Sequence, residues 1–459
     1  MHIAIVGGGW AGLSCAVRLR QHLDARHHGS QGHPAHRITV FESAPQCGGR
    51  ARGLYWHDHA IDNGQHLTIG AYRETFALLR AVGARPWAQD AMIWSGMDRQ
   101  VIGQRWSVPD TAWPARVLAA LIPGKGPRGW PLSWRWSMAR TLVRLARHRW
   151  SAPAIPVTQW LASQWVPHGL IAHFWQPLTE GALNTSIHEA NTAVLARVLR
   201  DSIGGNAYAT RIHQPHHNLS MDGVDPITAW CARHEVAIHT GHRVSMIHPD
   251  VEPSDAVRLT VQHAGMHSQC NADAVVIALP FHDTRRLWAD SSHPITSTIA
   301  RLERYAARAI TTVWIELPTH HQLRCAQWPS WFVLNPIRHV PHLGQVIVMR
   351  GVVMGVVISA RDARTLDHTR DSDQLREQLI AQLGMDISDM PQKWITEKSA
   401  TWACTPDAPD ASTFDAQGRT GVRHIFRCAD DLEPGYPATI ESAVRSGQRT
   451  AETILQERM

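Results

Sequence analysis

The first 42 residues constrain the fold of this chain more than any other segment. A β-branched run at residues 3–6 leads directly into Gly7, Gly9 and Gly12, which are spaced as GxGxxG. Apolar residues of helical period follow over 13–19, and a second β-branched run at 38–41 ends in Glu42. The order strand, glycine turn, helix, strand and acid predicts a βαβ unit with parallel strands.

This unit predicts a dinucleotide site. Gly7 is expected to form the tight turn, Gly9 to let the backbone approach a diphosphate, and Gly12 to let the helix pack on the strand. The helix N-terminus presents free N–H groups to the phosphates, and Glu42 is expected to accept hydrogen bonds from a ribose. A glycine-rich hairpin would not explain that acid. The candidate residues are Gly7, Gly9, Trp10, Ala11, Gly12, Glu42 and Ser43.

One spacing departs from the usual pattern. Glu42 lies 30 residues beyond Gly12, whereas about 20 is usual. The extra length falls in the polar segment 25–36, which we expect to be a lengthened loop.

A second glycine pair makes the cofactor assignment more specific. Gly48-Gly49-Arg50, followed by residues 62–66 (Asp-Asn-Gly-Gln-His), resembles the amine oxidase and phytoene desaturase superfamily of FAD enzymes. That resemblance implies that the Gly48–Gly49 backbone and Arg50 lie along the diphosphate and the flavin edge. It also implies that Asn63 and Gly64 contact the cofactor.

Distant segments carry the same resemblance. Residues 272–280 read as a buried strand that returns the chain to the FAD domain, and Val244 matches a residue that packs near the adenine. Asp430 ends a strand-like run, although the family usually has glycine where Ala429 precedes it. The resemblance places Asp430 on the ribityl and diphosphate groups. It also aims the N-terminus of the following helix, at Pro437, Ala438 and Thr439, at the flavin pyrimidine.

Looser segments resemble one group within the superfamily, the squalene-associated FAD-dependent desaturases, now called hydroxysqualene dehydroxylases, of bacterial hopanoid synthesis. These segments are 61–66, 70–75, 181–185, 198–202 and 436–439. The resemblance implies that reduced FAD delivers hydride to an allylic carbon of hydroxysqualene while the hydroxyl leaves as water. Hydroxide leaves poorly, so a proton donor is expected, and His66 and Glu180 are the candidates.

Three other functions fit the same motifs. A carotenoid- or polyprenyl-type desaturase would transfer hydride in the opposite direction, from the substrate to FAD. A flavin amine oxidase would place an aromatic cage beside the flavin. A non-catalytic carrier of prenylated cargo need not hold FAD.

We predict an α/β fold with a Rossmann-type FAD-binding domain and an inserted α+β substrate domain. Because the cofactor motifs must converge on one FAD, the FAD-binding domain is expected to combine residues 1–85, 215–285 and 415–459. The substrate-binding domain then combines 86–214 and 286–414.

The stretch 111–179 contains no acidic residue and eight tryptophans. On a helix through 134–147, Met138 and Leu142 share one face, with Trp134 and Leu145, while Arg140, Arg144 and Arg147 lie on the opposite one. This pattern is typical of a helix at a membrane interface near residues 111–150, and equally of an ordinary helix packed on a core.

Composition adds further expectations. Seven scattered cysteines without a CxxC pair favour a reducing, cytoplasmic location over a disulfide framework or a zinc site. Neither a signal peptide nor an apolar run of about 18 residues is present, so we expect no membrane-spanning helix, and at most peripheral contact with the inner face of the cell membrane. The net charge is +6, but the basic residues form no nucleic-acid-binding motif, so we expect no nucleic-acid partner. The histidines at 213, 216 and 217 have no further metal ligands in a suitable pattern, so we expect no metal site.

Overall fold

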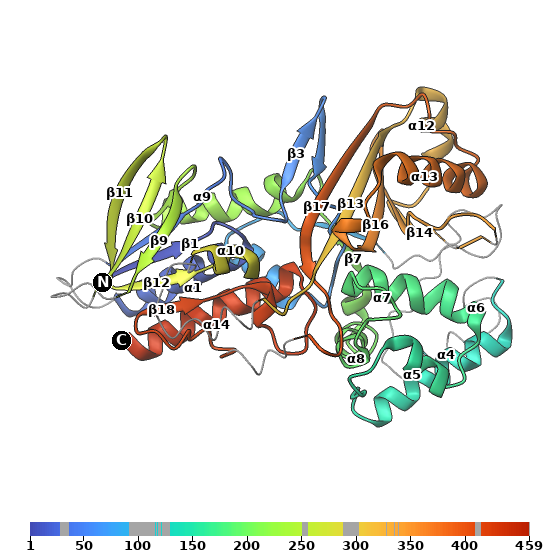
Figure 1. Ribbon diagram of the computed structural model, residues 1–459, viewed down its shortest axis with the longest axis horizontal. Helices are drawn as coiled ribbons and strands as arrows, with labels where there is room; N and C mark the ends of the chain where they lie inside the picture. The colour runs from blue at the N-terminus through green and yellow to red at the C-terminus, as the bar shows by residue number, and fades with distance from the viewer. Residues whose placement is uncertain are drawn as a thin grey trace.

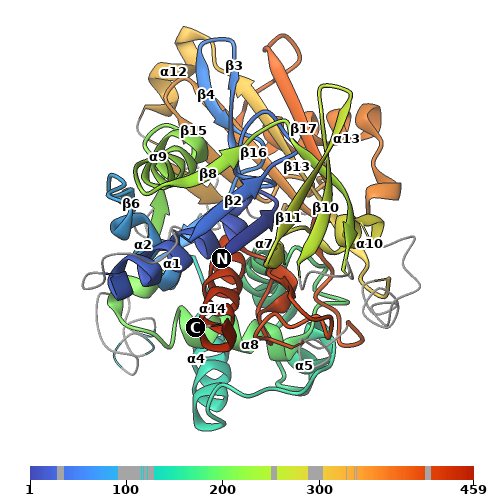
Figure 2. The same ribbon diagram turned by 90° about the vertical axis from the view of Figure 1, so that its left-hand side faces the viewer.

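The computed structural model describes residues 1–27, 36–90, 115, 117, 121, 129–249, 256–287, 303–326, 328–334, 336–337, 339–408 and 415–458. Two bodies are visible in Figure 1, one built around a parallel sheet and one around an antiparallel sheet with helices below it. Both termini lie at the end of the parallel-sheet body (Figures 1 and 2).

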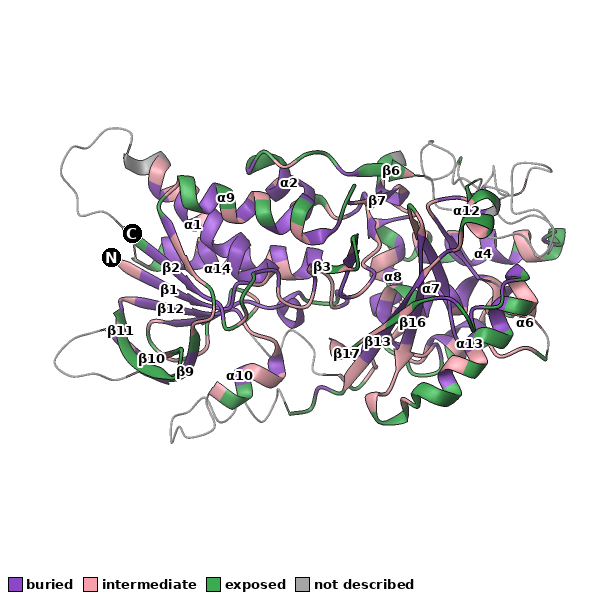
Figure 3. Ribbon diagram, turned by 90° about the horizontal axis from the view of Figure 1, so that it is seen from above, coloured by how far each residue is buried: buried purple, intermediate pink, exposed green. Residues whose placement is uncertain are grey.

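A five-stranded parallel sheet has the order β18-β12-β1-β2-β8. Its strands come from three separate stretches of the chain: β1 (His2–Val6) and β2 (Arg37–Phe41), β8 (Val236–His239) and β12 (Ala274–Ile277), and β18 (Ile425–Arg427). Strands β1, β2, β12 and β18 are almost wholly buried (Figure 3), as expected for a parallel sheet, whereas only Val236 is buried on the edge strand β8.

Each face of this sheet has its own cover. Ile3 and Ile5 pack against the helices α1 (Trp10–His27), α9 (Asp225–Arg233) and α14 (Ile440–Arg458). Ala4 and Val6 pack against a three-stranded antiparallel sheet of β9 (Arg243–His248), β10 (Val257–His263) and β11 (Met266–Ala272). The predicted Rossmann-type α/β fold is confirmed. Helix α1 continues through His27, so the expected loop starts later than residue 25, and residues 28–35 lie outside the described part.

The second body is built on an antiparallel sheet with the order β14-β15-β16-β13-β17. Its strands are β13 (Ala307–Glu316), β14 (Trp331–Val333), β15 (Val346–Arg350), β16 (Val353–Arg361) and β17 (Gln392–Trp402), with α12 (Thr319–Cys325) and α13 (His368–Leu383) beside it. One apolar core joins this sheet to the helices α4 (Leu132–Arg147), α5 (Val157–Ser163), α6 (His168–Leu170), α7 (Gln176–Leu183) and α8 (Thr192–Asp201). The division into FAD-binding and substrate-binding domains stays a prediction.

Smaller elements complete the fold. They are the hairpin β3 (Gly53–Trp56) and β4 (His59–Asp62), the strands β5 (Thr68–Ile69), β6 (Ala88–Asp90) and β7 (Ile212–Gln214), and the helices α2 (Arg73–Ala81) and α10 (Phe281–Leu287). Short helical turns are η1 (Ile171–Trp175), η2 (Ala207–Thr210), η3 (Ser220–Val224), η4 (Ala363–Thr365) and η6 (Asp430–Leu432).

Helix α4 carries the amphipathic pattern noted above. Its apolar residues Met138, Leu142 and Leu145 are buried in the core, so this face packs inside the protein. On the exposed face, Arg140 donates to the carbonyl oxygen of Gln164 over 2.6 Å, and Arg144 donates to its side-chain oxygen over 2.8 Å. The rest of the tryptophan-rich stretch before residue 129 lies outside the described residues, apart from 115, 117 and 121.

Across the described ranges, no helix is both long and apolar enough to cross a membrane.

Candidate FAD site

The first glycine motif lies at the carboxyl end of β1. Gly7 has φ of 112°, and a Cβ there would lie 2.5 Å from the Ala278 carbonyl oxygen, so only glycine fits. A Cβ on Gly12 would lie 2.1 Å from the Gly7 carbonyl oxygen, because α1 packs directly on the turn. The space over Gly9 is open, since the atom nearest to a Cβ there is 3.9 Å away. These are the three situations that a diphosphate-binding turn requires.

The second glycine motif lies beside the first. Gly48 and Gly9 form a parallel bridge, and the Gly48 N–H donates to the Gly8 carbonyl over 2.9 Å. The indole of Trp10 donates to the Ala51 carbonyl over 2.8 Å, which ties the start of α1 to the same segment. Two backbone stretches without side chains therefore form one cradle at the N-terminus of α1, whose first N–H groups have no acceptor within the helix.

Glu42 is buried at the end of β2 beside this cradle. Its carboxylate accepts hydrogen bonds of 2.7 Å from the Gly8 and Ala44 N–H groups, and the Ser43 hydroxyl lies 3.4 Å away. An ionised carboxylate accepts about four hydrogen bonds, so it retains capacity for ribose hydroxyls. Contact of Glu42 with a ribose stays a prediction.

Arg50 joins the second glycine motif to the C-terminal motif. Its guanidinium donates to Asp430 over 2.6 Å and to the Ala400 carbonyl oxygen, at the end of β17, over 2.8 Å. Asp430 begins η6 directly after Ala429, whose backbone is extended, with φ of −165°. Because any residue adopts that conformation, the backbone at this position does not require glycine.

The segment before α14 is held by several contacts. The Tyr436 ring lies between the guanidinium groups of Arg197 and Arg445, whose central carbons lie 5.5 and 4.9 Å from its centroid. The Thr439 N–H donates to the Ser442 hydroxyl over 2.8 Å, and the Ser442 N–H donates to the Thr439 hydroxyl over 3.1 Å, which forms a capping box.

The thiol of Cys404 lies beside Ala438, and burial raises its pKa to about 12. Of the two N–H groups that the sequence assigns to the flavin pyrimidine, that of Thr439 has a protein partner here, the Ser442 hydroxyl. Buried Pro437 lies between Tyr436 and these two residues.

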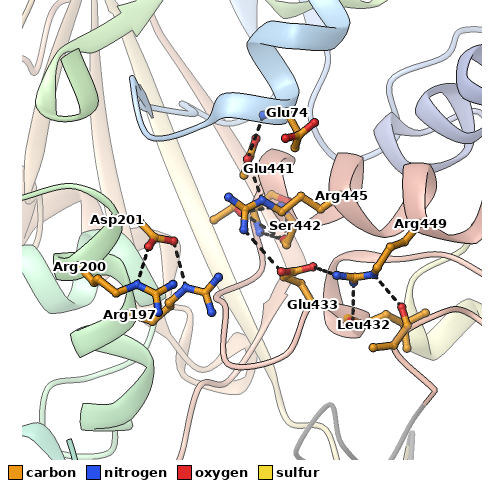
Figure 4. Close-up of polar contacts among 12 residues, drawn as sticks. Glu74, Arg197, Arg200, Asp201, Leu432, Glu433, Glu441, Ser442, Arg445 and Arg449 are labelled. Carbon is orange, nitrogen blue, oxygen red and sulfur yellow. Dashed lines mark hydrogen bonds and ion pairs between the residues drawn. The ribbon is translucent and has the colours of Figure 1, made fainter. Parts of the chain in front are cut away.

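A charged network that the sequence did not reveal fixes the same helix (Figure 4). The fully buried Glu441 accepts from the Glu74 N–H over 3.1 Å and from the Thr75 N–H and hydroxyl over 2.9 and 2.8 Å. Arg445 also donates to Glu441 over 2.8 Å. Glu441 therefore caps the N-terminus of α2 from the first turn of α14, across more than 360 residues of chain.

An open groove of about 590 Å³ lies among α1, α2 and α14. Ser14, Arg18, Glu74 and Glu452 are among its lining residues. None of the residues that the sequence assigns to the cofactor or to catalysis lines it.

The loop after β4 contacts Arg50. The Asn63 amide donates to the Arg50 carbonyl over 2.9 Å, and its oxygen accepts from the Arg52 N–H over 3.0 Å. The His66 ring lies beside the same Arg50 backbone, and burial lowers its pKa to about 4. A Cβ on Gly64 would lie 3.5 Å from Nε2 of His66. Asn63, Gly64 and His66 therefore lie together beside Arg50.

Glu180 lies on α7, in the second body. Its carboxyl is buried and accepts from the Gln176 and Gln345 amides over 3.2 and 2.9 Å, and burial raises its pKa. One turn later, the Asn184 amide donates over 3.0 Å to the Thr401 hydroxyl, next to the residue that Arg50 contacts. The structure records no hydrogen bond between Glu180 and His66, both of which it describes.

The remaining predicted residues lie apart from this cluster. Val244 on β9 is buried with Val6 and Phe41, and its contact with adenine stays a prediction. His213 packs on Phe76, with ring centroids 4.4 Å apart, whereas the ring of His217 pairs with Asp222. Within the ranges that the structure describes, no three His, Cys, Asp or Glu side chains are arranged to hold a metal ion.

The fold and the double-glycine cradle define a dinucleotide-binding flavoprotein, and comparison with known families agrees. The family described as NAD(P)-binding Rossmann-like domain matches residues 5–82, and that described as flavin containing amine oxidoreductase matches residues 175–455. The chain belongs to the flavin containing amine oxidoreductase family, and it is an FAD-dependent oxidoreductase.

Relatives of known name match the chain over its full length. The hydroxysqualene dehydroxylase of Zymomonas mobilis is 24% identical, with 98% of each chain covered, and that of Sinorhizobium fredii is 24% identical, with 99% of each covered. These matches confirm the resemblance to the hydroxysqualene dehydroxylase group. Among solved structures, putrescine oxidase bound to putrescine has a TM-score of 0.66 at 14% identity, with 99% of each chain covered, which shows a shared fold.

Proposed function

We propose that this chain catalyses FAD-dependent reductive dehydroxylation of hydroxysqualene to squalene. The observation that carries the proposal is the full-length similarity to hydroxysqualene dehydroxylases of two genera. The rival desaturase function has a weaker basis, because the 15-cis-phytoene desaturase of Synechococcus elongatus is 25% identical over only 36% of this chain.

The overall reaction replaces a hydroxyl by hydrogen. Reduced FAD, when bound, supplies the hydride that forms the new C–H bond. The electron pair of the broken C–O bond stays on oxygen, which must take up a proton to leave as water. The chain itself therefore has to provide a proton donor and a site that holds the alcohol.

We assign the proton donor to Glu180. Burial raises its pKa, so its carboxyl keeps its proton to higher pH than an exposed glutamate does. His66 has a pKa lowered to about 4, so its ring is neutral near pH 7 and is a poor acid there. His66 instead suits a hydrogen-bonding role beside Arg50.

We also propose peripheral contact with an anionic membrane on the cytoplasmic side, through the N-terminal end of α4. Leu132 and Trp136 are one turn apart on α4 and are 58% and 59% exposed. Arg140, one turn further along α4, donates a hydrogen bond to Gln164 at the end of α5. Trp165, which follows Gln164, is 84% exposed. Exposed aromatic residues beside arginines suit a lipid interface, and an isoprenoid substrate is drawn from the bilayer.

The test of the proposed function is product analysis. Purified holoenzyme is reduced under anaerobic conditions and incubated with hydroxysqualene or with phytoene, and the lipids are extracted for mass spectrometry. We expect squalene from hydroxysqualene and no change in phytoene. Desaturated phytoene formed by the oxidised enzyme, without any squalene in the other reaction, would instead establish a desaturase.

A further inference from the structure

The side chain of Gln65 is buried but has no hydrogen-bond partner. It is only 7% exposed, and within the described residues neither its amide nitrogen nor its amide oxygen has a partner. A buried polar group without a partner costs about 1–3 kcal/mol, so native structures rarely retain one unless a ligand or water pairs with it.

The backbone around Gln65 is firmly held. The Gln65 N–H donates to the Thr312 hydroxyl on β13 over 3.1 Å. Asp62, three residues earlier, accepts from the Leu219 N–H over 2.7 Å, and Asn63 is bonded on both sides to the segment 50–52. The backbone that carries the unpaired amide is therefore fixed in place, as the support of a binding group must be.

A second unpaired atom lies on the neighbouring residue. Nε2 of His66 is buried and has no partner among the described residues, and the ring lies beside the Arg50 backbone. The Gln65 amide offers both a donor and an acceptor, and neutral imidazole offers one more site. A single hydroxyl group, which donates once and accepts, matches this pair of residues.

These groups lie where the two bodies meet. Gln65 contacts β13 of the antiparallel sheet, and Asn63 contacts Arg50, which reaches Asp430. The cradle at Gly9 and Gly48 suits the diphosphate of the cofactor. The reacting end of the cofactor and the substrate are therefore expected at the boundary between the two bodies.

We propose that Gln65 is a substrate-binding residue whose side-chain amide hydrogen-bonds the hydroxyl of an otherwise apolar alcohol. The proposal rests on the proposed function for the identity of that alcohol. An isoprenoid alcohol that enters an apolar site loses the hydrogen bonds its hydroxyl made in water, and the Gln65 amide restores them. Gln65 thereby favours binding of the alcohol over its deoxygenated product, which has no group that can hydrogen-bond to the amide.

The test compares two ligands in matched variants. The oxidised holoenzyme is titrated with hydroxysqualene and with squalene delivered from cyclodextrin, and tryptophan fluorescence reports binding. We expect Gln65→Leu, which keeps the volume and removes both polar atoms, to bind hydroxysqualene about tenfold more weakly, the loss of one hydrogen bond to a neutral group. The affinity of Gln65→Leu for squalene should stay the same or increase. The affinity of Gln65→Asn for hydroxysqualene should lie between those of wild type and Gln65→Leu.

Three measurements can contradict the proposal: the thermal midpoint, the ligand preference and the state of the flavin. The thermal midpoint of Gln65→Leu should be unchanged or raised, because an unpaired buried amide is removed. Equal weakening for both ligands, or a lower midpoint with no ligand preference, would contradict the proposal by making Gln65 structural. A shifted flavin absorption spectrum without ligand, or loss of FAD from both variants, would make Gln65 a cofactor contact and also contradict it.

Failure of the proposed function is distinguishable from failure of this assignment. If the wild-type enzyme forms squalene while Gln65→Leu keeps its preference for hydroxysqualene, only the assignment of Gln65 is wrong. If the wild-type enzyme neither forms squalene nor prefers hydroxysqualene over squalene, the proposed function is wrong.

Discussion

The guanidinium of Arg50 donates a 2.6 Å hydrogen bond to the carboxylate of Asp430, 380 residues further along the chain. This pair joins the second glycine motif to the C-terminal motif. It also gives each partner its compensating charge, because both side chains are largely buried, with exposures of 25% and 10%.

The first prediction concerns this pair. Arg50→Gln removes the charge that compensates Asp430, so we expect FAD to bind at least tenfold more weakly, or about 1.4 kcal/mol. Fluorescence titration of the apoprotein with FAD measures this loss. In the double variant Arg50→Gln/Asp430→Asn the buried charge is gone as well, so the loss should be smaller than the sum of the two single effects. Strict additivity would show that the pair does not act as a unit.

The second prediction concerns Glu42. Glu42→Gln should weaken FAD binding by about 1–3 kcal/mol, the scale of hydrogen bonds to charged groups, because the carboxylate is expected to accept from the ribose. The variant also loses one acceptor for the Gly8 and Ala44 N–H groups. Glu452→Gln, at a half-exposed ion pair with Arg18, is the matched control and should leave FAD affinity unchanged. Equal affinities of Glu42→Gln and wild type would remove Glu42 from the cofactor site.

The third prediction tests the glycine turn. Gly12→Ala places a Cβ 2.1 Å from the backbone oxygen of Gly7, which cannot move without breaking the turn. We expect a loss of about 3 kcal/mol or more in the free energy of unfolding, above the usual range for overpacking. The control is Gly181→Ala, at an exposed position of helix α7, where nothing lies within 4 Å of the new Cβ. That change should stabilise the protein by about 0.5–1 kcal/mol.

The fourth prediction separates the two candidate acids by pH. An acid acts in its protonated form, so activity should fall as pH rises through the raised pKa of Glu180. Glu180→Gln should remove this limb of the kcat profile and lower kcat by about 10²–10⁴-fold, while FAD stays bound. Because the pKa of His66 is about 4, its ring should not titrate between pH 6 and 8. A limb near pH 6.5 that disappears in His66→Gln would assign the acid to His66.

The fifth prediction concerns the exposed end of α4. The variant Leu132→Ser/Trp136→Ser/Trp165→Ser should sediment with anionic liposomes much less than wild type, because it loses the residues that insert into the interface. Leu323→Ser, at another exposed leucine, on α12, is the control and should bind as wild type does. Charge reversal at Arg140 and Arg144 is a poorer test, because both arginines hold Gln164. If no form sediments with liposomes, the proposed membrane contact is wrong.

The cofactor cradle was largely predictable from the sequence, because its signals are local. Gly7, Gly9 and Gly12 stand in one turn, and the strand before them and the helix after them follow directly in the chain. The spacing of such a motif reports backbone geometry, which is why the parallel sheet appears where the βαβ unit places it.

Contacts between distant residues were not predictable. Nothing near Glu441 shows that it caps α2, because Thr75 lies 366 residues away. The pattern on α4 was ambiguous for a different reason, since a core helix and an interfacial helix present the same alternation of faces. Burial of Met138 and Leu142 shows that this face of α4 packs on the core, which leaves the exposed Leu132 and Trp136 for the proposed membrane contact. Gln65 was overlooked because a missing hydrogen-bond partner is visible only in three dimensions.

The most direct test of the whole account is an anaerobic single turnover. The FAD of the purified enzyme is reduced, excess reductant is removed, and hydroxysqualene is added while the flavin spectrum is followed. We expect the absorption of oxidised flavin to return at about 450 nm, with on the order of one squalene formed per flavin reoxidised. Flavin that stays reduced in the presence of hydroxysqualene, with no squalene extracted, would contradict it.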